Sequence, residues 1–108
     1  MKLTSKEMEI MVVLWDNEHP MTANEIIETS STRTWKENSI YIIMNTLIKK
    51  GAVILAHYKP TSTNNARAYT PAITSSEYMV RYIETAVKAG VSINTNELIK
   101  GIKSIEKG

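Results

Sequence analysis

The chain of 108 residues contains no cysteine and no phenylalanine, and only three prolines and four glycines. The lack of cysteine excludes disulfides, thiolate metal sites and a cysteine nucleophile. No apolar run approaches the roughly 20 residues that a membrane-spanning helix needs, and the first residues do not have the pattern of a signal peptide. We therefore expect a compact cytoplasmic protein with a modest core and no membrane association.

The sequence also lacks the recurring motifs of catalytic sites. Nucleophile, metal-binding and phosphate-loop patterns are missing. His19 precedes Pro20 at a predicted helix end and His57 lies in a predicted strand, with no acid placed to form a dyad with either. Trp15 and Trp35 are more simply explained as core residues than as a stacking surface for a cofactor. The sequence therefore predicts no enzyme, no cofactor and no metal ion.

Positive charge is concentrated in the middle of the chain. The formal net charge is only +2, but residues 33–71 hold six basic residues and one acidic residue, a net charge of +5. Residues 1–32 have a net charge of −4 and residues 72–108 a net charge of +1. A basic central segment of this kind is typical of a surface that binds a polyanion.

Four predicted helix starts share one pattern, a threonine or asparagine followed three residues later by glutamate. The first residue caps the helix N-terminus and the glutamate bonds back to the N–H of the cap, which makes a capping box. An apolar residue before each cap and another four residues after it predict a hydrophobic staple. The four pairs are Thr4 with Glu7, Thr22 with Glu25, Thr74 with Glu77 and Asn94 with Glu97.

Apolar periodicity places helices behind these caps and one further helix in the middle of the chain. The expected helices span 5–16, 23–30, 37–50, 75–89 and 95–105. Two extended segments, 53–59 and 66–70, flank a stretch of turn-forming residues and predict a β-hairpin that ends at Pro71. Together these elements predict a mainly α fold with a small β-hairpin, a winged helix-turn-helix. Residues 1–71 would then form a DNA-binding domain and residues 72–108 a C-terminal helical dimerisation region.

Helical spacing gives the segment 37–50 two different faces. The residues expected to face the core are Ile40, Ile43, Met44, Leu47 and Ile48. The opposite face, the recognition face, carries Asn38, Tyr41, Ile42, Asn45 and Lys49. Lys49 and Lys50 supply cations for the helix C-terminus, and Gly51 ends the helix. For the first helix, the same reasoning predicts a buried stripe of Met8, Met11, Val12 and Trp15.

A helix with this outer face fits the major groove of B-DNA, where bases are read by hydrogen bonds and methyl contacts. Asn45 can donate and accept at an adenine edge, and Lys49 and Lys50 suit phosphates. Ile42 fits contact with a thymine methyl, although it could instead pack beneath the hairpin. The predicted DNA contacts on and just before this helix are Lys36, Asn38, Ser39, Tyr41, Ile42, Asn45, Thr46, Lys49 and Lys50.

The hairpin carries three further candidates for DNA contact, His57, Lys59 and Arg67. They flank a turn without acidic residues, so this wing could lie along the phosphate backbone or in the minor groove. The alternative is a solvated loop whose charges serve only solubility.

The two C-terminal helices have apolar stripes that a chain of this size cannot hide alone. Pairing with a second copy would cover them, and packing back against the helix at 5–16 is the alternative. The predicted dimerisation residues are Met79, Tyr82, Ile83, Ala86, Leu98, Ile99 and Ile102.

Three stretches, LTSKEMEIMVVLWDNEHPMTANEII, TWKENSIYIIMNTLIKKGAVI and AYTPAITSSEY, resemble the penicillinase repressor (BlaI/MecI/CopY) family of bacterial winged-helix regulators. The likeness runs from about Leu3 to Tyr78 and is most specific at Trp15, Trp35, residues 23–26 and residues 47–51. The resemblance implies a homodimeric repressor of transcription that binds double-stranded DNA at an inverted-repeat operator, commonly with TACA/TGTA half-sites.

The chain departs from the family pattern on the recognition helix and in the tail. In the family, threonines and an arginine on this helix meet DNA; Ser39 and Ile42 stand at threonine positions and Thr46 where arginine is common. Members relieved by an antirepressor protease are cut at an Asn-Phe bond, and copper-responsive members carry C-terminal cysteines. This chain contains neither phenylalanine nor cysteine, so the sequence supports neither release mechanism.

Two other functions fit the same pattern of elements. A winged-helix protein-interaction module without DNA binding could use the exposed face around Tyr41 and Ile42 to hold a partner. A corepressor-bound sensor would need a pocket between the hairpin and the C-terminal helices, and the sequence offers no convergent polar set for one.

Overall fold

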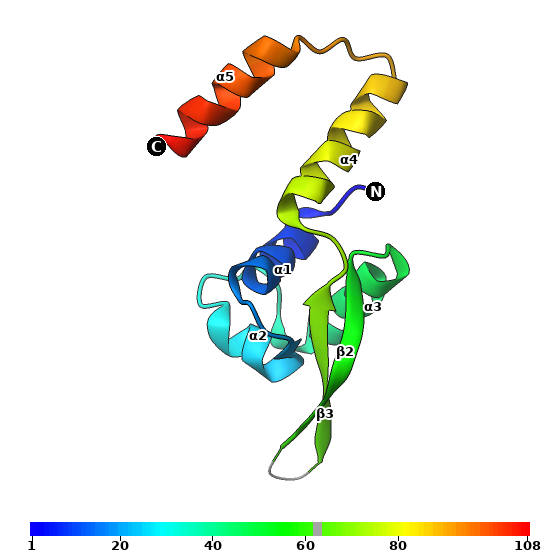
Figure 1. Cartoon of the computed structure of the whole chain (residues 1–108). Helices are drawn as coiled ribbons and strands as arrows, with labels where there is room; N and C mark the ends of the chain where they lie inside the picture. The colour runs from blue at the N-terminus through cyan, green and yellow to red at the C-terminus, as the bar shows by residue number, and fades with distance from the viewer. Residues whose placement is uncertain (62–63) are drawn as a thin grey trace.

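A computed structural model describes residues 1–61 and 64–108. It shows a body of three helices and an antiparallel ribbon, from which two C-terminal helices extend (Figure 1). The elements are α1 (Ser5–Asp16), β1 (Met21–Thr22), α2 (Ala23–Thr29), the 3-10 turn η1 (Glu37–Ser39), α3 (Ile40–Lys49), β2 (Val53–Pro60), β3 (Asn65–Pro71), α4 (Ser75–Lys88) and α5 (Thr95–Glu106). No helix in this described part is both long and apolar enough to cross a membrane. The predicted winged helix-turn-helix is confirmed.

The capping boxes form at three of the four predicted positions. Thr4, Thr22 and Thr74 each accept the N–H of the glutamate three residues on, and each glutamate accepts the N–H of its threonine in return. At Asn94, within the described residues, the structure shows only the first half of the box, the bond from the Glu97 N–H. These caps satisfy N–H groups that have no partner inside the helix, which is why the helix starts agree with the sequence.

The sheet has three strands in the order β1-β3-β2, all antiparallel. The strand β1, which the sequence analysis missed, pairs Met21 with Tyr69 and Thr22 with Ala68. The ribbon of β2 and β3 continues beyond β1 and has an irregular register between Leu55 and His57. A two-residue strand has no periodicity of its own, so only the tertiary pairing reveals it.

The buried stripe of α1 is shifted by one residue toward the N-terminus from the predicted one. Met11 belongs to both stripes, and Met8, expected in the core, is half-buried. Ile10, Met11 and Leu14 are buried, together with Glu7. Val12, expected in the core, is 45% exposed, and Trp15 is half-buried with its indole N–H bonded to the Ile73 carbonyl at 2.9 Å. Both stripes have helical spacing, so it is the packing of α1 against α2, α3 and β3 that decides which stripe is buried.

The helix expected over 37–50 begins with one 3-10 turn and becomes α-helical only at Ile40. Ile40, Met44 and Leu47 are fully buried as predicted, and Ile43 is half-buried against the core. Ile48, also expected in the core, is exposed. Gly51 ends the helix with φ +79°, a left-handed conformation that costs glycine little.

The first turn of α4 belongs to the body, and the rest of the helix leaves it. Tyr78 is buried, lies with its ring centroid 6.1 Å from that of Trp15, and accepts the Leu3 N–H with its hydroxyl oxygen at 3.2 Å. Beyond Tyr78, α4 projects from the body, and α5 lies far from α1 (Figure 1). The alternative in which these helices pack back against α1 is therefore wrong for α5.

Candidate nucleic-acid interface

The outer side of η1 and α3 is exposed along its whole length. Asn38, Tyr41, Ile42, Asn45 and Lys49, the recognition face, all lie on the surface. Ile42 is 71% exposed, which contradicts the alternative that it packs beneath the hairpin. A helix held by Ile40, Met44 and Leu47 on one side thus presents a mixed polar and apolar strip on the other.

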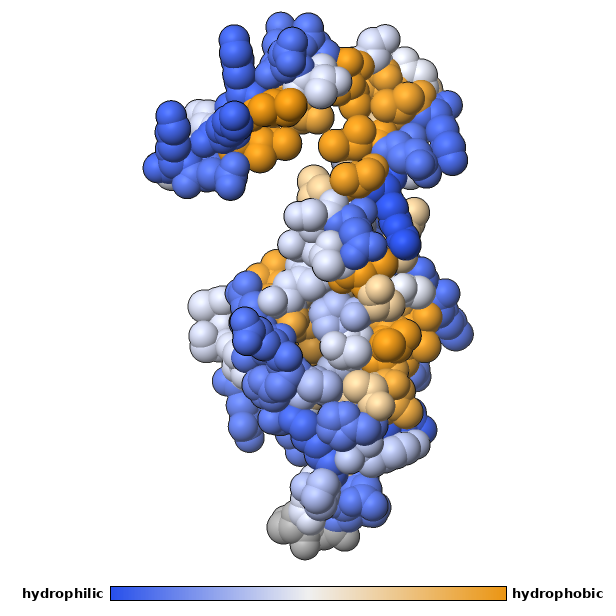
Figure 2. All heavy atoms as spheres, viewed as in Figure 1, coloured by the Kyte–Doolittle hydropathy of each residue, from blue (hydrophilic) through white to orange (hydrophobic). Residues whose placement is uncertain are grey.

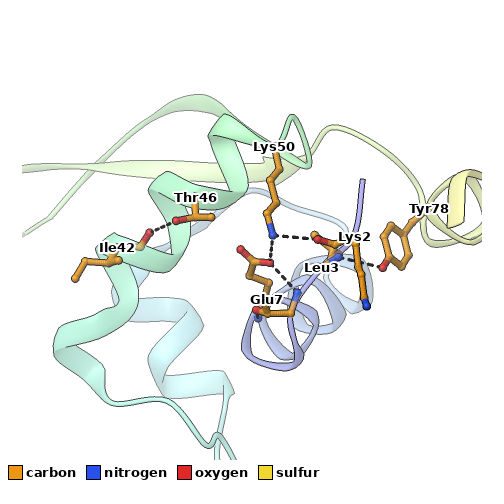
Figure 3. A network of polar contacts seen from close by, with 8 residues as sticks. Lys2, Leu3, Glu7, Ile42, Thr46, Lys50 and Tyr78 are labelled. Carbon is orange, nitrogen blue, oxygen red and sulfur yellow. Dashed lines mark hydrogen bonds and ion pairs between the residues drawn. The ribbon is translucent and has the colours of Figure 1, made fainter. Parts of the chain in front are cut away.

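Two smaller candidates on this helix are less available. Ser39 and Thr46 are half-buried. The Thr46 hydroxyl donates to the Ile42 carbonyl oxygen at 3.0 Å, so its proton is already used inside the helix (Figure 3). Thr46 can still accept a hydrogen bond, but it is not a free donor toward a base.

The wing and the helix-turn-helix enclose a polar groove. Tyr41 of α3 and Arg67 of β3 line it together, although 26 positions separate them in the sequence. Three asparagines that sequence reasoning missed, Asn24, Asn64 and Asn65, also line this groove. The turn-rich composition around residue 64 predicted a loop but carried no signal that its amides face the same groove as α2.

Lys50 was predicted to contact phosphate, and the structure places it elsewhere. Its Nζ forms an ion pair with Glu7 Oε1 at 2.5 Å and donates to the Lys2 carbonyl at 3.0 Å (Figure 3). Glu7 is only 4% exposed, and its burial alone would raise its pKa. Hydrogen bonds from Lys50 and Thr4 outweigh that effect and lower the pKa of Glu7. Lys50 therefore neutralises a buried carboxylate rather than standing free for DNA.

Lys59 is likewise engaged within the protein. Its Nζ donates to the Pro20 carbonyl at 2.7 Å and lies 3.1 Å from Glu25 Oε1. The Thr22 N–H, followed by Lys59, lowers the pKa of Glu25 against the opposing effect of burial. Two lysines predicted as phosphate contacts thus pair with the glutamates of the first two capping boxes.

Three of the predicted cations remain available. Lys36, Lys49 and Arg67 are exposed, and none of them pairs with a carboxylate in residues 1–61 and 64–108. His57 is also exposed on β2. The basic surface is therefore smaller than the sequence suggested, and it lies at the two ends of α3 and on the wing.

The segment before α3 is anchored to the body. Thr34 donates its backbone N–H and its hydroxyl to the carboxylate of Glu9 on α1. Arg33 pairs with Glu37 at 3.0 Å, and its guanidinium lies 5.3 Å from the ring centre of Trp35, which is buried. These contacts hold the N-terminal end of the recognition helix in place against α1.

The C-terminal region of residues 72–108, the tail, presents an apolar surface on α4 and α5. Met79, Tyr82, Ile99 and Ile102 are exposed and Ile83, Ala86 and Leu98 are half-buried. The apolar sides of α4 and α5 face each other across an open hollow (Figure 2). Apolar residues that were not predicted extend this surface, and they include Val87, Val91 and Ile93, which line the hollow with Ile83 and Leu98.

Three helices, a three-stranded sheet with a projecting ribbon and an exposed second helix of the helix-turn-helix define a winged-helix protein. The model of the penicillinase repressor family matches residues 3–104, and the chain belongs to that family. The match extends well into α5, beyond the residues up to Tyr78 that carry the resemblance in the sequence. This is a family of repressors and not of enzymes.

A curated sequence and a solved structure from Bacillus licheniformis both match the chain. Its penicillinase repressor is 36% identical over 78 residues, which make up 72% of this chain and 57% of the relative. The chain therefore matches little more than half the length of that protein. The solution structure of monomeric BlaI in complex with the blaP half-operator superimposes with a TM-score of 0.52 at 33% identity. The superposition covers 72% of this chain and 89% of the BlaI chain.

Proposed function

We propose that this protein is a sequence-specific DNA-binding repressor of transcription that acts as a homodimer on an inverted-repeat operator. The observation that carries the proposal is the exposed recognition face beside a groove that Arg67 lines. Membership of the penicillinase repressor family and the half-operator bound to the related BlaI chain support it.

In this proposal, α3 enters the major groove and reads bases with few side chains. Asn45 is exposed and can bond in a bidentate manner to N6 and N7 of an adenine. Ile42, the most exposed apolar side chain of α3, contacts a thymine methyl. Lys36 and Lys49 bind phosphates near the two ends of α3, and these contacts set register rather than sequence.

The groove between the wing and α2 accommodates the backbone of one DNA strand. Arg67 supplies the cation, and Tyr41 with the asparagines of the groove supplies neutral donors for phosphate oxygens. His57 adds a donor farther along β2. Lys50 and Lys59 are left out of the contact set because their ammonium groups are held by Glu7 and Glu25.

The tail joins two protomers in this proposal. The apolar residues of α4 and α5 lie outside the body, and burial against a second copy removes them from water. Two-fold symmetry then places the two copies of α3 about 34 Å apart, one turn of DNA. We keep the boundary between the domains at residues 71 and 72, with Ile73 and Tyr78 as the residues that dock the tail on the body.

Selection of bound duplexes from a random pool tests the proposal. An enriched inverted repeat with half-sites one turn apart is the expected result. Replacement of single thymines by uracil in the enriched site then removes only a methyl group. Ile42 predicts one position at which this lowers affinity, and the Ile42→Ala variant should no longer sense the change. Failure to bind any duplex at 50 mM salt would favour a protein-interaction module, because phosphate contacts alone give detectable affinity there.

A further inference from the structure

Lys59 ties the wing to the first helix of the helix-turn-helix. The residue lies on β2, whereas its partners Pro20 and Glu25 lie before β1 and on α2. Because β3 stands between β1 and β2 in the sheet, the lysine side chain bridges the width of the sheet. The ammonium group has three N–H donors, and two of them bond to the Pro20 carbonyl oxygen and to Glu25 Oε1.

This tie joins the two walls of the polar groove. One wall is the outer part of β3, where Lys59 stands opposite Ala66 in the register, next to Arg67. The other wall is the start of α2, where Glu25 Oε1 also accepts the Thr22 N–H at 2.9 Å. The pairing of β1 with β3 reaches only to Ala68, so Lys59 holds the wing at a level that β1 does not reach.

We propose that Lys59 is a positioning residue that holds the wing at a set distance from α2, so that the groove between them fits a strand of DNA. The inference rests on the proposed DNA binding. Lys59 acts through Glu25 and Arg67 and not through a phosphate of its own. The pair therefore raises affinity while its charges stay bonded to each other.

A direct and an indirect role of Lys59 predict opposite effects of the substitution Glu25→Gln. If Lys59 bound phosphate, Glu25 would compete for its ammonium group and repel DNA, and Glu25→Gln would strengthen binding. If Lys59 positions the wing, Glu25→Gln loosens the tie and weakens binding. Glutamine is accepted at this position of a capping box, so the variant keeps the start of α2.

The chain offers a matched control for this experiment. Glu77 closes the same capping box with Thr74 at the start of α4, and in the described residues no lysine pairs with it. Glu77→Gln removes the same charge from the same type of cap without touching the wing. Thermal melting of each variant, followed by circular dichroism, sets a temperature at which all of them are folded.

The binding assay uses the full chain and a labelled random-sequence duplex of about 24 base pairs, titrated at several salt concentrations. Lys59→Met and Glu25→Gln should each weaken binding about fivefold, as expected for one lost ordering contact. The slope of log affinity against log salt should stay that of the wild type, because no phosphate contact is lost. The double variant should be no weaker than either single one, and Glu77→Gln should match the wild type.

Two results would overturn the positioning role. One is tighter or unchanged binding by Glu25→Gln, and the other is a salt slope reduced by about 0.9 in Lys59→Met, which marks a phosphate contact. A wild-type chain that fails to bind the duplex at 50 mM salt would overturn the proposed function itself, so the two failures are distinct.

Discussion

Two neighbouring lysines at the end of α3 provide a sharp test of the interface. Lys49 is exposed without a carboxylate partner among the described residues, whereas Lys50 pairs with Glu7. We expect Lys50→Met to destabilise the fold and Lys49→Met to weaken DNA binding. The same substitution one residue apart should thus affect two different properties.

The magnitude for Lys50 follows from the burial of its partner. Removing one member of a fully buried ion pair costs about 3–5 kcal/mol because a charge is left uncompensated. Glu7 is 4% exposed, but the Lys50 side chain is 29% exposed, so water can reach the vacated position. We therefore expect a loss of about 2 kcal/mol in the free energy of unfolding. With an unfolding entropy of about 2.1 cal/mol/K per residue, this lowers Tm by roughly 9 °C.

The magnitude for Lys49 follows from counterion release. Each phosphate contact contributes about 0.9 to the slope of log affinity against log salt. Between 50 and 200 mM salt, the affinity of Lys49→Met should therefore fall by a factor about 3.5-fold smaller than the factor for the wild type. Its free energy of unfolding should change by less than about 0.5 kcal/mol, as for other surface substitutions.

Both variants are measured at equal protein concentration by thermal melting and by fluorescence anisotropy with a labelled duplex. A Tm of Lys50→Met equal to that of the wild type would refute the ion-pair assignment. A reduced salt slope for Lys50→Met would show that the lysine reaches DNA after all. The double variant Glu7→Gln with Lys50→Met should recover part of the lost stability, because no unpaired charge remains.

Three further predictions concern base reading, pH and assembly. Asn45→Ala should cost about 1–3 kcal/mol at one base position of the selected operator and leave binding to random duplex unchanged; equal losses on every base variant would remove Asn45 from base reading. The folded-state pKa of Glu7 lies below its ordinary value of 4.5, so its stabilising contribution is complete above that value and is lost as pH falls below it. Tm should accordingly drop as pH falls below 4.5, and less steeply in Glu7→Gln, as melting at a series of pH values can check. Ile83→Glu should give monomers in sedimentation at concentrations where Thr85→Glu, on the other side of α4, still forms dimers; a monomeric wild type would refute the dimer.

Much of the secondary structure was predictable because its signals are local. A capping box needs only residues three apart, and the starts of α1, α2 and α4 agree with it. Gly51 marks the end of α3 in the same local way. The strand β1 had no such signal, since its two residues count as a strand only through their pairing with β3.

The recognition face could be predicted in part. Helical spacing of the apolar residues placed Tyr41, Ile42 and Asn45 outward, and the structure agrees. The roles of Lys50 and Lys59 could not be predicted, because their partners lie 43 and 34 positions away. A lysine in a sequence carries a charge but no information on which carboxylate the fold brings to it.

The sequence by itself determined where α1, α2, α4 and α5 begin, that a hairpin follows α3, and that positive charge gathers in that region. These properties depend on interactions within a few residues of one another. Tertiary structure decided which stripe of α1 is buried and which cations remain free for a polyanion. It also brought Asn24, Tyr41 and Arg67 to one groove. These choices depend on the packing of distant segments, where two helical faces one residue apart have the same periodicity and only contact with the other elements distinguishes them.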